Sequence, residues 1–318
     1  MNVRDHSPDD LAVSIVRTLA WFSLFSHPLT SLELWKWLLM PGRQYAFEEV
    51  VAALEEDAWL RQRIVSERGF FALAEGELIA TLIERRQAGF LDAARKFKKL
   101  RRIVRFFGLL PSVRAVAACN SLAWHHTDSS SDIDLLVLVR PGSLWTTRLL
   151  LVAPFALLGK RPLRLPSRSS VDPFCFSFFL STDAPSVAIL QLLPRDPYLA
   201  YWTRSLVPVF ERGNAWTDFQ QANEWASSPL PNAYPQPPHS ELAPSWVLPG
   251  IVPRISGFEA AAKRLQERRL PAEVKHMANQ DSRVVVSDVM LKFHTNDRRA
   301  EFYERWKAVV EREGVLLE

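Results

Sequence analysis

The spacing of apolar residues along the first quarter of the chain predicts short helices followed by a hairpin. Apolar positions recur every three or four residues in three stretches, 11–27, 32–39 and 47–60. Thr30 is a suitable N-cap for the second of these helices, with Glu33 in its first turn. Two short apolar runs around Gly69 indicate paired strands over 63–73. The first part of the chain is therefore expected to contain three helices and then a hairpin.

A long helix is predicted over 77–107, and its second half is strongly basic. Seven Lys and Arg residues lie within 95–105. A single apolar seam remains, formed by Phe97, Leu100, Val104 and Phe107. A solvated helix surface is the simplest interpretation of these charges. Contact with phosphates or with a nucleic-acid backbone is the alternative.

Beyond Pro111 the pattern alternates between strands and helices, which is typical of an α/β fold. Strand-like apolar runs cover 113–119, 133–139 and 173–181. Helices are expected from about 121 and over 144–158. The later part of the chain is predicted to be helical and aromatic-rich over 185–225, helical over 255–278 and 297–311, and extended over 283–287.

The composition is that of a globular protein with a mildly basic surface. Of 318 residues, 48% are hydrophobic and 23% charged, and the net charge is only +4. Cys119 and Cys175 lie in apolar strand-like runs, so we interpret them as core thiols in a reducing compartment. The first ten residues are polar, unlike a signal peptide, and the longest apolar run, 149–158, is too short to cross a bilayer. A cytoplasmic protein without membrane contact is expected.

Two carboxylates at the start of an apolar strand carry the main functional hypothesis. Asp132 and Asp134 are two residues apart, so on a strand they project to the same face. Close ionised carboxylates need a counter-charge, which a hard divalent cation supplies. The turn Asn120–Ser121 lies between a strand and a helix start, where backbone N–H groups bind anions. These features indicate a nucleoside triphosphate with Mg²⁺, or with Mn²⁺ as the alternative ion. A solvated strand entrance and a plain helix N-cap at Ser121 are the structural alternatives.

The same residues resemble the sequence pattern of the nucleotidyltransferase fold of the DNA polymerase β superfamily. That pattern is a strand, a Gly-Ser pair, a spacer, and then Asp-x-Asp inside a second strand. Here Asn120–Ser121 stands in place of Gly-Ser, and Asp132-Ile133-Asp134 supplies the carboxylate pair. Three further stretches, 142–148, 174–181 and 291–299, resemble an uncharacterised bacterial branch of this superfamily.

The resemblance implies a nucleotidyltransferase-like mixed sheet with helices, and transfer of NMP from an NTP to a hydroxyl group. Asp132 and Asp134 would bind the metal, and Asn120 and Ser121 would contact the nucleotide. The acceptor, which is a protein, an RNA or a small molecule, stays unspecified. The implied organisation is a winged-helix-like domain over 1–76, a basic connecting helix over 77–110, a nucleotidyltransferase core over 111–185, and a helical region over 186–318 with a proline-rich strap at 229–253.

Active members of this family usually carry a third carboxylate on a later strand, where it helps to deprotonate the attacking hydroxyl. The predicted strand over 174–180 has no acidic residue, and of the two flanking acids, Asp172 and Asp183, Asp172 is the better candidate although Pro173 separates it from the strand. A further hypothesis brings Lys292, His294 or Arg298 back toward the phosphates. The alternative is that this polar segment caps the closing helix.

Two functions from different classes remain open. The chain is a magnesium-dependent nucleotidyltransferase, or it is a regulatory protein that senses a nucleotide without turnover. The predicted third helix is acidic because it contains Glu48, Glu49, Glu55, Glu56 and Asp57. DNA phosphates would repel it, so a nucleic-acid partner finds no support there and the N-terminal domain is interpreted as an interaction element. An antitoxin-type nucleotidyltransferase is a third alternative, but that class is usually much smaller.

Overall fold

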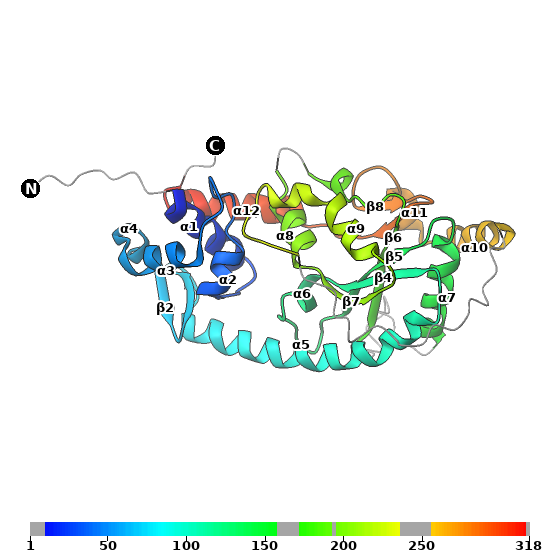
Figure 1. Ribbon diagram of the computed structural model, residues 1–318, viewed down its shortest axis with the longest axis horizontal. Coiled ribbons are helices and arrows are strands. Elements are labelled where there is room, and N and C mark those ends of the chain that lie inside the picture. Colours follow the sequence, from blue (N-terminus) through cyan, green and yellow to red (C-terminus); the bar gives the residue numbers. More distant parts are fainter. Residues whose placement is uncertain (1–9, 158–171, 193–194, 236–255, 316–318) are drawn as a thin grey trace, which may run out of the picture.

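The computed structural model describes residues 10–157, 172–192, 195–235 and 256–315. Most of the predicted proline-rich strap and the polar start of the chain lie outside these residues. The described chain is a mixed α/β structure with two sheets, and this confirms the predicted fold class at that level. Figure 1 shows one long helix, α5 (Ile79–Gly108), running along one side of the molecule from the smaller sheet to the larger one.

The N-terminal part contains helices and then a hairpin, as predicted, together with a short strand, β1, that was not predicted. Its elements are α1 (Asp10–Ser23), β1 (Leu29–Thr30), α2 (Ser31–Lys36), α3 (Phe47–Glu56), α4 (Ala58–Arg61), β2 (Ile64–Glu67) and β3 (Phe70–Leu73). Thr30 and Glu33 cap α2 reciprocally, which is a capping box. The helix expected over 47–60 is instead two helices. Asp57 has an extended backbone that ends α3, and its carboxylate caps α4 by accepting hydrogen bonds from the N–H groups of Trp59 and Leu60.

The larger sheet has six strands in the order β7-β4-β5-β6-β9-β8. They are β4 (Val113–Ala118), β5 (Ile133–Val139), β6 (Phe174–Ser181), β7 (Val207–Glu211), β8 (Val284–Val286) and β9 (Met290–Phe293). Only the β5–β6 pair is parallel among the described pairs, which makes the sheet mixed. Neither β7 nor β9 was predicted, and the segment containing β7 had been expected to be helical.

Helices cover both faces of this sheet. The helices of this part of the chain are α6 (Asn120–Ala123), α7 (Leu144–Leu157), α8 (Pro197–Ser205), α9 (Ala215–Ala222), α10 (Ser256–Arg269), α11 (Ala272–Met277) and α12 (Arg299–Arg312), with short 3-10 turns at Ala188–Leu190 and Glu224–Ser227. One face packs on α5, α7 and α10 through residues such as Leu135 and Val137. The opposite face packs on α8 and α9 through Leu136 and Leu138.

The N-terminal helices share one hydrophobic core with α8 and α12. Trp21 of α1 stacks on Tyr201 of α8 and makes an edge contact with Trp306 of α12. The Trp306 indole also donates a hydrogen bond of 2.9 Å to the Arg17 carbonyl. Segments that lie far apart in the sequence therefore pack together in one core. None of the helices in the described parts of the chain is both long and apolar enough to cross a membrane.

Candidate functional site

The predicted carboxylate pair lies where β5 begins. Asp132 precedes the strand and Asp134 is its second residue. Asp134 precedes Leu136 by two positions, and Leu136 packs with Leu199 and Trp202 of α8. Because alternate strand residues share a face, the pair points to the α8 side of the sheet.

A chain of polar contacts crosses the strand ends at this edge of the sheet. The Asp134 side chain interacts with Asn120, the first residue of α6, and with Cys175, its register partner on β6, and both interactions lower the pKa of Asp134. Cys175 also contacts Ser177. Ser177 Oγ lies 3.1 Å from His294 Nε2, just after β9. The sequence motifs around 120, 134, 175 and 294 therefore meet in one place.

The turn that stands in place of Gly-Ser keeps the backbone conformation that favours glycine. Asn120 has a φ of 56°, in the left-handed region that Asn tolerates better than most residues. The Cys119 N–H donates a 3.1 Å hydrogen bond to the Asp134 carbonyl, which fixes the turn against β5. Asn120 and Ser121 both line a cavity on the α8 side of the sheet.

The carboxylate pair carries more negative charge than its surroundings compensate. Burial, together with the neighbouring Asp134 charge, raises the pKa of Asp132 from 3.8 to about 6. Burial also raises the pKa of Asp134, although Asn120 and Cys175 act in the opposite direction. A bound cation would lower both pKa values and complete the charge balance.

A buried lysine fixes the loop that leads into the pair. The Lys96 side chain is fully buried on α5, and its ammonium lies 2.9 Å from an Asp92 carboxylate oxygen. It also donates hydrogen bonds to the carbonyls of Asp128 and of Ser131, the latter at 2.8 Å. Because Ser131 directly precedes Asp132, α5 controls where the first carboxylate lies.

Asp172, the candidate third carboxylate, is engaged elsewhere. Its side chain is only 3% exposed and forms ion pairs with Arg95, at 2.5 Å, and with Lys99, at 3.4 Å. Both cations belong to α5, which covers the face opposite to Asp134. Within the described residues, no group of three or more His, Cys, Asp or Glu side chains is arranged to hold a metal. The residue that contacts Asp134 from β6 is the thiol Cys175.

The three polar candidates near the C-terminus line a cavity of about 220 Å³ together with Asn120. Lys292 is buried, and its ammonium donates to the Ser282 carbonyl at 2.7 Å and pairs with Asp297 at 3.3 Å. Burial lowers the pKa of Lys292 to about 8 and that of His294 to about 4. Arg298 is exposed and pairs with Glu301.

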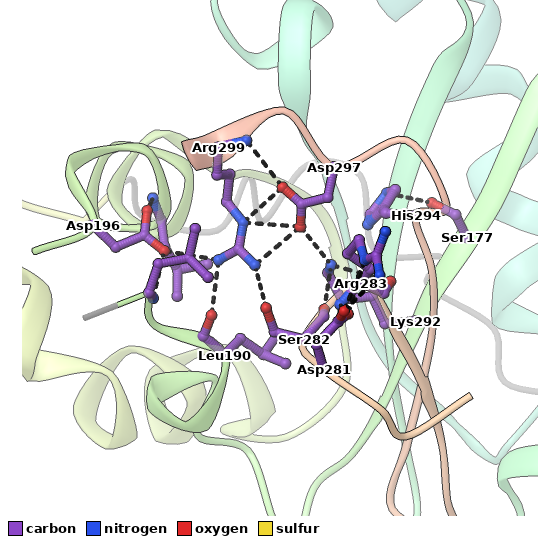
Figure 2. Close-up of polar contacts among 12 residues, drawn as sticks. Ser177, Leu190, Asp196, Asp281, Ser282, Arg283, Lys292, His294, Asp297 and Arg299 are labelled. Carbon is purple, nitrogen blue, oxygen red and sulfur yellow. Dashed lines mark hydrogen bonds and ion pairs between the residues drawn. The ribbon is translucent and has the colours of Figure 1, made fainter. Parts of the chain in front are cut away.

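A buried ion-pair network backs this cavity. Figure 2 shows Arg299 between Asp196 and Asp297, at nitrogen–oxygen distances of 2.7 and 2.9 Å. Lys292 shares Asp297, so two cations and two carboxylates balance within the network. These contacts join α12 to the segment before α8 and to the end of β9. The cavity wall is thus held by charges that neutralise each other.

Two parts of this site were not expected from the sequence. Cys175 and Ser177 had been assigned to the core or left without a role, and the aromatic residues of α1 had been assigned to a separate domain. The alternation of β6 gives a weak signal for Cys175 and Ser177, because they interrupt a run of phenylalanines at every second position. Comparison with protein-family models, with curated proteins and with solved structures finds no match to this chain.

Proposed function

We propose that this chain binds a nucleoside triphosphate with Mg²⁺ at Asp132, Asp134 and the Asn120–Ser121 turn, and transfers NMP to a hydroxyl acceptor. The observation that carries the proposal is the uncompensated carboxylate pair at the start of β5, which lies beside the left-handed turn at Asn120 and is held there by the hydrogen bond from the Cys119 N–H to the Asp134 carbonyl. Mg²⁺ would supply the missing charge and polarise the phosphates. The turn offers backbone N–H groups to an anion.

The order of the elements gives further support. The sequence α5-β4-α6-β5-α7-β6, with β4 antiparallel and β6 parallel to β5, agrees with a nucleotidyltransferase-like mixed sheet. In the N-terminal part, the helices α1 to α4, the β2–β3 hairpin and the added strand β1 agree with a winged helix. The exposed acids of α3, among them Glu55 and Glu56, favour a protein-interaction role for it over DNA binding.

The test is label transfer from each α-labelled NTP, with Mg²⁺, to total cell RNA, cell protein or the chain itself. Transfer should disappear in the double variant Asp132→Asn with Asp134→Asn. Asp128→Asn is the matched control, because Asp128 lies in the same loop but its carboxylate is held by Ser130 and Ser131. NTP affinity that is unchanged in the folded double variant would remove the site assignment.

Binding without turnover is the second candidate function, and Cys175 favours it. A thiol whose pKa is raised by burial stays protonated and is no substitute for a metal-binding carboxylate on β6. Without a third acid, one ion is held and the acceptor hydroxyl has no base. Mg²⁺-dependent NTP binding without label transfer would support this candidate, and Cys175→Asp would then be expected to create transfer activity.

A further inference from the structure

A cavity of about 310 Å³ lies beside the Asn120–Ser121 turn, and most of its wall is aromatic. Two of its rings, Trp21 and Phe22, come from α1 near the start of the chain, and a third, Phe25, comes from the turn that follows α1. Its volume is at the lower end of the range of about 300–1,000 Å³ that small-molecule sites occupy. The N-terminal part of the chain, through α1 and the turn after it, thus forms one wall of this cavity.

The opposite wall comes from α8 and α12. Tyr198 and Trp202 of α8 and Phe302 of α12 line this cavity and also line the smaller cavity that contains Lys292 and His294. Tyr198 and Phe302 are stacked with ring centroids 5.8 Å apart and planes 5° from parallel. Asn120 borders both cavities, so the phosphate-binding turn lies between an aromatic compartment and a polar one.

The chemistry of the aromatic compartment selects an uncharged flat group. Its titratable members include His27 and His126, and burial lowers the pKa of each below 6.5, so both imidazoles are neutral near pH 7. Arg86 lies against His27 but pairs with Glu33. A phosphate would find no free cation among these lining residues, whereas a planar ring would find faces on which to stack.

We propose that this cavity binds the base of the nucleotide whose phosphates contact the Asn120–Ser121 turn. The placement of the phosphates rests on the proposed function, but the binding of a ring does not, because no residue of the aromatic wall belongs to the carboxylate pair. Different parts of the chain would then bind different parts of the nucleotide. The Asp pair and the turn engage the phosphates, and the N-terminal helices, through α1, engage the base.

The test measures the binding of the ring and the binding of the phosphates separately. Calorimetry would measure the affinity for adenosine and for cytidine in the presence of a chelator, for magnesium tripolyphosphate, and for magnesium ATP. The variant is Phe302→Ala, at the half-buried edge of the cavity, with Phe302→Leu as a second variant that keeps most of the volume. The matched control is Phe106→Ala, a half-buried ring that packs on Phe107 and Phe155, away from the cavity.

Phe302→Ala should weaken nucleoside and ATP binding about tenfold, the usual effect of removing one stacking ring, and leave tripolyphosphate binding unchanged. Phe106→Ala should leave all affinities unchanged. The proposal would be overturned if nucleosides did not bind the wild type. It would also be overturned if folded Phe302→Ala and Phe302→Leu bound nucleosides with the same affinity as the wild type. A ring compound that binds only after magnesium ATP would assign the cavity to the acceptor and also overturn it.

The same experiment distinguishes a failure of the ring site from a failure of the proposed phosphate and magnesium site. Nucleoside binding in chelator that survives the Asp132→Asn, Asp134→Asn double variant, with no magnesium-dependent ATP binding in any variant, would remove the phosphate site and keep the ring site. Magnesium-dependent tripolyphosphate binding without nucleoside binding would do the reverse.

Discussion

Replacing Asp132 with asparagine is expected to stabilise the metal-free protein at neutral pH. The folded state raises the pKa of this carboxyl from 3.8 to about 6, chiefly through burial and secondly through the charge of Asp134. A carboxyl with a raised pKa favours the folded state while it is protonated. Its contribution to stability is therefore complete below pH 3.8 and is lost as pH rises through about 6.

The size of the effect follows from the shift. About two pKa units correspond to about 3 kcal/mol, and solvent screening of a partly exposed group reduces this to about 1–2 kcal/mol. Asp132→Asn removes the charge and keeps the shape, so the variant should gain this amount above pH 7. Below pH 4 both side chains are neutral, so the free energies of unfolding should converge.

Urea unfolding in chelator at pH 4, 5, 6, 7 and 8 measures the difference. Asp128→Asn is a control with the opposite sign, because hydrogen bonds from Ser130 and Ser131 lower the pKa of Asp128. That variant should lose stability at pH 7 and recover it toward acid pH. An Asp132→Asn variant that is less stable than the wild type at pH 7, or a gap that does not change with pH, would refute the reasoning.

Three further substitutions test other parts of the site. Asp172→Asn should lower the free energy of unfolding by about 1–2 kcal/mol at pH 7, because Arg95 lowers the pKa of Asp172 and pairs with its carboxylate. The loss should be smaller at pH 3, and magnesium binding should not change. Asn120→Ala should be about 1 kcal/mol less stable than Asn120→Gly in thermal unfolding, since both lose the amide and only alanine resists a positive φ. Lys96→Met should cost about 2–3 kcal/mol by urea unfolding and weaken magnesium binding by calorimetry, whereas the exposed Lys98→Met should change either by little.

Much of the local structure could be predicted from the sequence because local signals agree with the final packing. The capping pair of α2, the hairpin turn at Gly69 and the span of β5 each depend on residues that lie close together in the chain. The strand β7 escaped prediction because Pro208 lies within it. Proline is tolerated there because β7 is an edge strand, a fact that only the assembled sheet reveals.

The candidate site was predictable only where its members share a motif. Asn120 and Asp134 belong to a spaced pattern, and the structure brings their side chains together. The contact of Cys175 with Asp134 depends on a parallel register with an irregularity two residues later, which no local pattern encodes. The approach of α1 to the turn depends on packing against α8 and α12, so sequence reasoning placed its aromatic residues in a separate domain.

The shared core of α1, α8 and α12 also sets an order of events during synthesis. Trp21 needs Tyr201 and Trp306 as neighbours, and Arg63 donates a hydrogen bond to the Glu313 carbonyl. The N-terminal helices leave the ribosome long before these partners exist, and their apolar faces stay exposed until the last helix is made. Such a chain is expected to depend on a chaperone holding its first segment during translation, and to complete folding only after release.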